Sequence, residues 1–537
     1  MSDFPFLTVM VVVPLVGAVA TAALPGGHKV QLPKLVALGT SLLTLALGVV
    51  MASGFDRDGG FQFTEQHTWI KVFGASYAMG VDGLGLLMVL LTALLVPIVI
   101  GASWYDADPG VTLRADDEAA ETRHTKAFFA WVLALEALSI AVFAATDVFL
   151  FYVVFEATLI PAYFLVGGFG GNLRRRAAVK FLVYQLAGGL VMLAAVIGLY
   201  TVSASHGTPS YLFSDLQALP IDLDTQKWLF VGFFVAFAIK APLFPVHTWL
   251  PDTTEQATTG TSVLLVCILD KIGAYGMLRF CLGLLPGGSQ WATPVVITFA
   301  LISIVYGALV AIGQDDMLRL FGYMSVSHFG FIVLGIFVLT TQGGSGAVLY
   351  MVNHGLATAA LFLVAGFLIK RRGTASIRAM GGVEKVAPVL GGLFLVFGLA
   401  ALSLPGLSPF VSEIMVLIAA FQHHWWTGAI AVSAIVLTAF YVLWMYQRTM
   451  TGPDLVLRDG SSLTSSGTIR GGETEFTDLD RREVGTLAPL FLGLVLFGFF
   501  PMPLLNVINP YVQDTLAHVG VTDPAPTVAA PAQGGQQ

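Results

Sequence analysis

Seven ionisable side chains lie inside long apolar segments of this sequence, where charged residues are rare. A charged side chain near the centre of a membrane helix costs about 2.5–3.5 kcal/mol on insertion scales, and such residues commonly mark a functional path. Lysine, glutamate and histidine can bind and release protons when a neighbouring charge changes. The pattern therefore indicates a proton relay, formed by Lys240, Lys271, Glu136, Glu156, Glu413, His328 and His354.

The alternative is that these groups form structural ion pairs that hold helices together. That interpretation suits one isolated Glu–Lys pair. Seven ionisable groups on seven different apolar segments exceed what such a role requires, so the sequence favours the relay.

Prolines interrupt the apolar segment that carries the first lysine. Pro242 and Pro245 follow Lys240 and remove backbone donors, which should free the carbonyl groups of Ala238 and Ala241. Irregular backbone at membrane depth is tolerated where it lines a cavity. We therefore expect these carbonyl groups to bind ordered water or a cation beside the ammonium group.

A second interruption, Leu404-Pro405-Gly406, shortly precedes Glu413. The two broken segments stand five positions apart in the order of apolar segments. Broken helices at matching positions of two halves are typical of inverted repeats in transporters. The pattern predicts that Lys240 and Glu413 are counterparts in two such repeats.

Three polar or aromatic residues, His247, Trp249 and Asp252, follow the first interruption. One interpretation is a helix-end cap with an aromatic side chain at the membrane interface. The other is a path from the cytoplasm to Lys240. The sequence leaves both open.

The composition requires a membrane. Of 537 residues, 56% are hydrophobic and 11% are charged, with a mean hydropathy of +0.81, whereas soluble domains carry about 25% charged residues. Apolar stretches of roughly 20 residues, the length that crosses a bilayer, recur along the chain. They are 4–24, 33–53, 79–101, 126–146, 148–169, 178–202, 227–249, 259–283, 293–313, 319–340, 346–369, 387–421, 428–450 and 486–508.

The sequence thus predicts an all-α polytopic membrane protein with about fourteen transmembrane helices. Two inverted repeats are expected, helices 4–8 and 9–13, with helices 7 and 12 discontinuous. The chain should divide into three N-terminal spans with an acidic cytoplasmic loop, a first repeat, a second repeat, a cytoplasmic loop, a last span and a disordered tail. These parts are 1–125, 126–283, 293–450, 451–485, 486–518 and 519–537.

Positive charge predicts the orientation. Loops after odd-numbered helices hold 20 of the 26 Lys and Arg residues, loops after even-numbered helices hold four, and the remaining two are Lys240 and Lys271. Because positive charge marks the cytoplasmic side, both termini should face outward from a plasma (inner) membrane. The formal charge of −7 gives no indication of nucleic-acid binding, and lipids are the expected surroundings.

Redox chemistry has no recognisable site in the sequence. Cys267 and Cys281 would lie about 21 Å apart on one helix, too far for a disulfide. No dinucleotide fingerprint, cysteine set or haem-ligand pattern is present. We expect no cofactor and no metal in this chain.

Five motifs resemble the antiporter-like membrane subunits of respiratory complex I, and the resemblance covers nearly the whole chain. They are Lys-Ala-Pro-Leu-Phe-Pro-Val-His-Thr-Trp-Leu-Pro-Asp from Lys240, Asp-Lys-Ile-Gly-Ala-Tyr-Gly from Asp270, Phe-Glu-Ala-Thr-Leu-Ile-Pro from Phe155, Tyr-Met-Ser-Val-Ser-His-Phe-Gly from Tyr323 and Asn-His-Gly-Leu from Asn353. Two of three related subunits carry lysine in the twelfth helix. This chain resembles the third, in which Leu-Pro-Gly precedes a glutamate, here Glu413.

The resemblance implies a role for each site residue. Glu156 would tune Lys240, Lys271 and His328 would carry the proton onward, His354 would belong to the same hydrated axis, and Glu413 would lead toward the outlet. It also implies partners: the other membrane-arm subunits, including two antiporter-like homologues. NADH, FMN, iron–sulfur clusters and quinone would then be bound by partner subunits.

Two departures from the family pattern stand out. The loop after the broken helix reads Pro251-Asp252-Thr-Thr, without the family's histidine and second proline. Asp270 beside Lys271 is also unusual. Adjacent helix positions point about 100° apart, so we expect Asp270 to serve a neighbouring subunit rather than to neutralise Lys271.

Other functional classes share this fold. They are a subunit of a multisubunit sodium/proton antiporter, a subunit of a membrane-bound hydrogenase, and a non-conducting scaffold of the membrane arm. The setting of Glu413 argues against the first two, and the ionisable line argues against the third.

Overall fold

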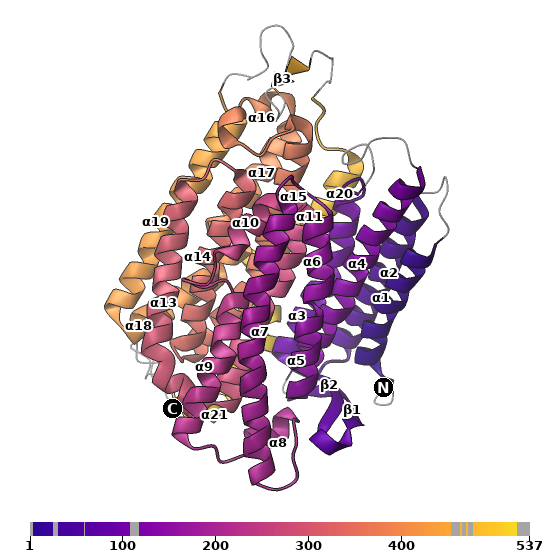
Figure 1. The fold of residues 1–537 in the computed structure, drawn as a ribbon. Coiled ribbons are helices and arrows are strands. Elements are labelled where there is room, and N and C mark those ends of the chain that lie inside the picture. Colours follow the sequence, from indigo (N-terminus) through magenta and orange to yellow (C-terminus); the bar gives the residue numbers. More distant parts are fainter. Residues whose placement is uncertain are drawn as a thin grey trace, which may run out of the picture.

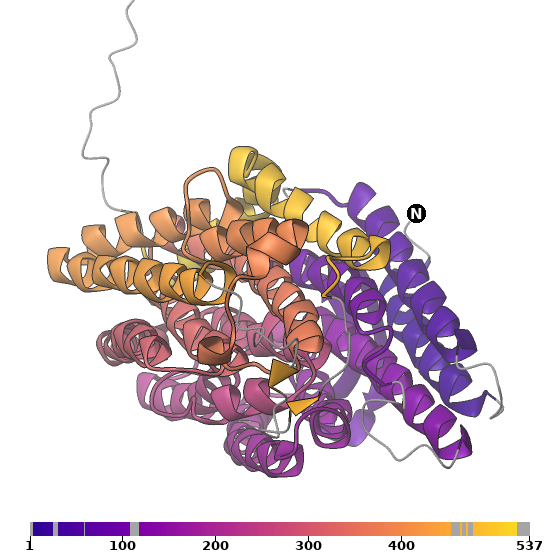
Figure 2. The same cartoon turned by 90° about the horizontal axis from the view of Figure 1, so that it is seen from above.

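The computed structural model describes residues 4–24, 31–57, 59–107, 118–452, 462–463, 469–470 and 476–523. Within these residues, long helices run side by side from one end of the molecule to the other (Figure 1). Seen along their axes, α1 (Phe6–Ala23) and α2 (Gln31–Ser53) lie at one edge and α19 (Trp425–Met450) lies at the opposite edge (Figure 2).

Twelve spans in the described residues are long and apolar enough to cross a membrane. Their helices begin at side-chain caps in several cases, as at Asp82, Asp147 and Asp316, whose carboxylates accept a backbone N–H of the first turn. Besides α1, α2 and α19, they are α3 (Gly83–Ala102), α4 (Glu118–Ala144), α5 (Val148–Ala157) with α6 (Leu159–Gly168), α7 (Arg174–Ser205), α11 (Thr259–Leu264) with η3 (Leu265–Leu269), α12 (Asp270–Gly276) and η4 (Met277–Leu282), α13 (Pro286–Ile312), α14 (Met317–Phe337), α15 (Thr341–Arg372) and α20 (Arg481–Phe499).

Two predicted spans are interrupted, as the prolines indicated. The first consists of α9 (Leu223–Lys240) and α10 (Trp249–Gln256), and the second of α17 (Pro388–Ala401) and α18 (Ser408–His423). The prediction of a helical multi-span membrane protein is confirmed. The count of fourteen crossings and the inverted repeats stay predictions.

The smaller elements lie at the two ends of the helices. They are α8 (Phe213–Gln217), α16 (Val383–Val386), α21 (Met502–Val519), η1 (Lys71–Phe73), η5 (Ile377–Ala379) and the strands β1 (Gln62–Ile70), β2 (Ala75–Val81), β3 (Ser462–Leu463) and β4 (Ile469–Arg470). The antiparallel hairpin β1–β2 lies at the same end as α21 and the start of α1, opposite α16 (Figure 1).

Two features differ from the prediction. The β1–β2 hairpin occupies a stretch that the hydropathy analysis treated as a loop, where Phe63, Thr64, Thr68, Trp69 and Ile70 favour a strand. The last apolar stretch ends at Phe499, and α21 forms a separate helix after Pro501. Parts of three predicted segments lie outside the described residues: 108–117 of the acidic loop, 453–461, 464–468 and 471–475 of the loop 451–485, and 524–537 of the tail 519–537.

Four spans form the centre of the molecule. The span from α11 to η4 is 100% buried, and α14 and α15 are each 94% buried, whereas α2 is 28% buried. α3 joins this centre. A helix that is apolar on all sides suits such a position, so the ionisable residues on these spans are enclosed by protein rather than by lipid.

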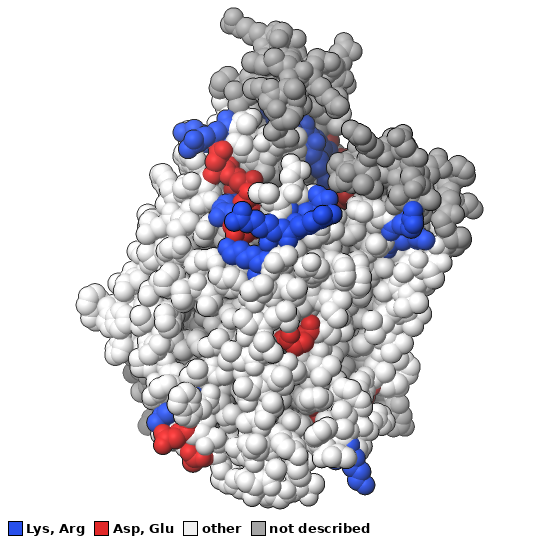
Figure 3. Space-filling view, in the orientation of Figure 1, with Lys and Arg blue, Asp and Glu red and all other residues white. Residues whose placement is uncertain are grey.

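Charge is concentrated at one end of the molecule. On the face shown in Figure 3, most lysines and arginines gather at the end where α16 lies, and the long middle of the molecule carries almost no charge. This arrangement matches the unequal distribution of Lys and Arg between the two sets of loops.

Candidate functional site

The first interruption places Lys240 at the end of a helix inside the protein. Helix α9 stops at Lys240, and the chain resumes as a helix at Trp249. The indole of Trp249 donates a hydrogen bond of 3.0 Å to the carbonyl of Ile239. The Ala238 carbonyl accepts from the N–H of Leu243 at 2.9 Å. The prediction of a free Ala238 carbonyl was therefore wrong, because the backbone turns back to satisfy it.

The Lys240 ammonium group is enclosed but has no hydrogen-bond partner. Its side chain is buried, its Nζ makes no hydrogen bond, and it lies 4.8 Å from the centre of the Phe155 ring. Its electrostatic partners are Asp270 and, more weakly, Glu156. An enclosed ammonium group without a hydrogen bond is suited to giving up its proton, because few contacts hold the charged form.

Glu156 lies on α5 and faces α7. A methyl group added at Gly189 would come within 1.8 Å of Oε1 of Glu156, so the carboxylate occupies the space that this glycine leaves. Glu156 interacts electrostatically with Lys240. The structure thus brings these two predicted residues together.

Lys271 connects the central span to α15. Its ammonium group donates to the carbonyl of Val266 at 3.0 Å and hydrogen-bonds Nδ1 of His354 at 2.6 Å. The π-helical turn η3 ends two residues before Lys271, and the π-helical turn η4 follows α12. π-helical turns inside α-helices are frequent at functional sites.

Two histidines and a tyrosine continue from Lys271. The rings of His328 on α14 and His354 on α15 are 5.3 Å apart, and that of His328 is 5.9 Å from Tyr350. Tyr350 lies one helical turn before His354 on α15. All three side chains are buried.

The second interruption positions Glu413. The buried carboxylate of Glu413 accepts hydrogen bonds from the hydroxyl of Ser403 and, at 3.1 Å, from that of Tyr350. Ser403 lies in the break that contains Pro405 and has a positive φ of 60°, which L-residues rarely adopt. Asn353 of α15 donates to the carbonyl of Ser408 at 2.7 Å, which fixes the start of α18 against the central helices.

Three predicted residues, Glu136, His247 and Asp252, do not join this line. Glu136 on α4 is buried, and neither of its carboxylate oxygens has a hydrogen-bond partner. His247 is buried between Phe244 and Tyr306, with ring-centre distances of 5.9 and 5.1 Å, and neither ring nitrogen has a partner. His247 lies in the interruption of the first broken helix, but it forms no hydrogen bond with Lys240.

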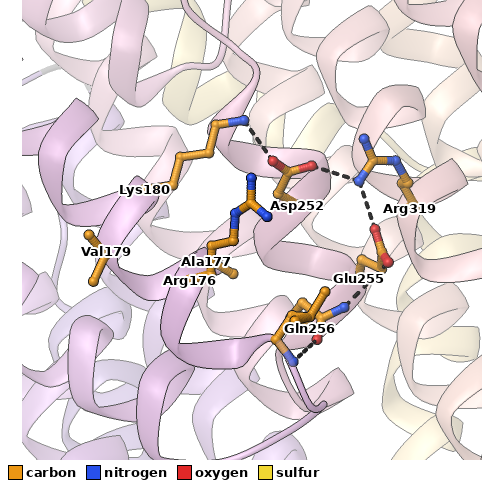
Figure 4. A pocket seen from close by; sticks show the side chains of 9 residues that line it. Arg176, Ala177, Val179, Lys180, Asp252, Glu255, Gln256 and Arg319 are labelled. Atoms are coloured by element: carbon orange, nitrogen blue, oxygen red, sulfur yellow. Dashed lines mark hydrogen bonds and ion pairs between the residues drawn. The ribbon is translucent and has the colours of Figure 1, made fainter.

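Asp252, in the first turn of α10, belongs to a separate ion-pair network that joins α10 to α7 and α14. Lys180 and Arg319 each lie 2.6 Å from its carboxylate, and Arg319 also binds Glu255 at 2.7 Å. These groups line a cavity of about 560 Å³ (Figure 4). Burial alone would raise the pKa of Asp252, but the hydrogen bonds from Lys180 and Arg319 outweigh it and lower the pKa.

Sequence reasoning missed Tyr350 and Ser403. The position of Tyr350 could have been predicted, because it precedes His354 by four residues and therefore lies on the same helix face. No pattern in the sequence indicates the role of Ser403, since its contact with Glu413 depends on the fold of the segment between α17 and α18. Asp270 was expected to face a neighbouring subunit, but it is buried inside this chain, so that expectation was wrong.

Known proteins match this chain over most of its length. The family described as NADH:quinone oxidoreductase/Mrp antiporter, TM, matches residues 145–438. NADH-quinone oxidoreductase subunit M of Mycobacterium tuberculosis (strain ATCC 25618 / H37Rv) is 47% identical over 554 aligned positions, which cover 99% of this chain and 97% of that protein.

Two solved structures are also similar. A chain of respiratory complex I from Thermus thermophilus with bound NADH has a TM-score of 0.82 and 31% identity, over 96% of this chain and all of that chain. A chain of the Mrp complex from Dietzia sp. DQ12-45-1b has a TM-score of 0.80 and 20% identity, over 96% of this chain and 98% of that chain. The second likeness shows a shared fold alone.

The branch with glutamate in the twelfth helix is the one called subunit M, so these matches agree with the branch that Glu413 predicted. Because the identity to a subunit M reaches 47% over nearly the whole length, the chain belongs to the subunit M family of NADH-quinone oxidoreductases.

Proposed function

We propose that this chain is the proton-translocating subunit M of an NADH:quinone oxidoreductase and that its protons pass from Glu156 and Lys240 through Lys271 and the two histidines to Glu413. The observation that carries this path is the arrangement on α15. His354 hydrogen-bonds Lys271 at 2.6 Å, and Tyr350, one turn away, donates to Glu413 at 3.1 Å. One helix therefore links Lys271 on the central span to Glu413 on the second broken span.

The energy for transport comes from outside the chain in this proposal. Each 100 mV of membrane potential adds about 2.3 kcal/mol to the movement of a proton across the membrane. Partner subunits that bind NADH, FMN, iron–sulfur clusters and quinone would release this energy. The two antiporter-like homologues would be further partners in the membrane arm. The match to a chain of a complex I with bound NADH supports this assembly.

We propose fourteen crossings, in two inverted repeats, with both termini on the outer face of the plasma membrane. Lys and Arg gather at the end of the molecule where α16 lies, whereas the start of α1 and the helix α21 lie at the other end (Figures 1 and 3). Because positive charge marks the cytoplasmic side, this arrangement supports that orientation. The interruptions at Lys240 and before Glu413 support the repeats. The division into the six sequence parts given above is part of the same proposal.

The variant Lys240→Ala tests the path. We expect the complex to assemble and NADH-driven proton uptake into sealed membrane vesicles to fall about tenfold, since a barrier raised by 1.36 kcal/mol has that effect. Lys227→Ala is the matched control, because Lys227 lies on the same helix α9 and pairs with the exposed Asp224. It should pump as the wild type does.

Two results would contradict the proposal. An assembled Lys240→Ala complex with undiminished pumping would show that the chain is a non-conducting scaffold. Sodium-dependent transport in vesicles that lack NADH oxidation would instead favour an antiporter subunit.

The variant Gly189→Ala tests the position of the Glu156 carboxylate. The added methyl group would displace this carboxylate from α7, and we expect proton uptake to fall about fivefold, for a barrier raised by roughly 1 kcal/mol. Gly39→Ala on α2 is the control, because a methyl group there meets nothing within 4 Å. Equal proton uptake by both variants would mean that proton transport does not depend on the position of the Glu156 carboxylate.

A further inference from the structure

Asp270 is a buried carboxylate that the path described so far does not use. Its side chain is 1% exposed, and neither oxygen has a hydrogen-bond partner. It lies on α12 in the span that is wholly enclosed by the rest of the chain. A buried carboxylate without hydrogen bonds is costly unless opposite charges or a bound proton compensate it.

The packing of α12 determines where Asp270 faces. Gly273, one turn later on the same helix face, lies against the end of α9. A methyl group at Gly273 would come within 2.5 Å of the Ala241 nitrogen and 2.6 Å of the Phe237 carbonyl. Asp270 therefore faces the end of α9, where Lys240 is located.

Lys271 points about 100° away from Asp270 around the same helix. It makes its hydrogen bonds to Val266 and to His354 on α15. Helix α12 thus presents a carboxylate to the first broken helix on one side and an ammonium group to α15 on another.

The two lysines have no direct hydrogen bond to each other in the described residues. Lys240 makes none at all, and those of Lys271 go elsewhere. Asp270 interacts electrostatically with both, and it is a stronger partner of Lys240 than Glu156 is. Asp270 is therefore a buried carboxylate that interacts with both ammonium groups, although it forms no hydrogen bond with either in the described residues.

We propose that Asp270 carries the proton between Lys240 and Lys271, an inference that rests on the proton path proposed above. The Lys240 ammonium group gives a proton to the Asp270 carboxylate, so an N–H bond breaks, an O–H bond forms, and a neutral amine and a carboxylic acid remain. The acid then gives this proton to the Lys271 amine, which has passed its own proton to His354. The carboxylate is restored, and no electron is transferred.

Three variants of the intact complex test this step. Asp270→Asn keeps the size of the side chain but cannot act as an acid, so we expect NADH-driven proton uptake to fall about tenfold in an assembled complex. Asp270→Glu restores a carboxylic acid and should keep at least about half of the wild-type uptake. Asp224→Asn, an exposed carboxylate at the other end of α9, should have no effect.

The outcomes separate this step from the path as a whole. If Lys240→Ala pumps normally, the proposed function fails. If Lys240→Ala loses pumping and Asp270→Asn keeps it, only the role of Asp270 is overturned. An equal loss of proton uptake in Asp270→Asn and Asp270→Glu would also overturn the proposed role, because such a result would indicate that Asp270 serves only packing.

A spectroscopic measurement gives an answer even if the amide variant does not assemble. Infrared difference spectra of the complex during NADH oxidation should contain a carboxylic-acid C=O band that shifts in Asp270→Glu. Identical spectra of the wild type and Asp270→Glu would overturn the proposal.

Discussion

Replacing Arg279 by leucine is expected to prevent assembly of the chain into its complex. The guanidinium group binds both carboxylate oxygens of Asp82, at 2.6 and 2.8 Å, and both side chains are buried. Four aromatic rings surround it, with centres 4.8 to 5.5 Å away. Leucine would leave the Asp82 carboxylate buried and unpaired, which costs about 3–5 kcal/mol from a typical stability of about 5–15 kcal/mol.

Native gel electrophoresis of solubilised membranes measures this effect as the fraction of assembled complex. The double variant Asp82→Asn with Arg279→Leu should recover part of the loss, because it removes the unpaired charge, although the cap of α3 also depends on Asp82. Arg57→Leu is the control, because Arg57 is exposed and lines the same cavity as Asp82 and Arg279. Assembly of Arg279→Leu at the wild-type level would contradict a structural role for the pair.

Replacing Glu413 by glutamine is expected to abolish most proton transport and to leave the fold intact. The glutamine carbonyl can still accept the hydrogen bonds that Ser403 and Tyr350 donate to the carboxylate. It cannot bind or release a proton in the range where a carboxylate does. With the only carboxylate of the second broken span removed, we expect uptake to fall about 30-fold, which corresponds to roughly 2 kcal/mol in the barrier.

The measurement compares proton uptake per NADH oxidised in sealed vesicles that contain equal amounts of assembled complex. Glu384→Gln, at the start of the short helix α16, serves as the matched control. If Glu413→Gln retained the wild-type ratio, the second broken span would lie outside the proton path.

The sequence alone predicted the membrane spans, the seven intramembrane ionisable residues and both interruptions. Each depends on an energy that acts locally along the chain. Apolar runs of about 20 residues must leave water, an intramembrane charge such as Lys240 is costly wherever the helix packs, and Pro242 or Pro405 cannot donate a backbone hydrogen bond in any fold. The motifs around Lys240 and Glu413 were also enough to indicate the correct branch of the family.

The tertiary structure decided which of these residues meet. It joined Lys271 to His354 and Tyr350 to Glu413, and it left Glu136 apart from the line. It also paired Asp252 with cations from α7 and α14. It also turned Asp270 toward α9, whereas the sequence pointed it at a neighbouring subunit. These contacts depend on which helix faces pack together. At Gly273, for example, the absence of a side chain allows α12 to approach the end of α9. Contacts of that kind join residues far apart in the chain, so no local pattern of the sequence could specify them.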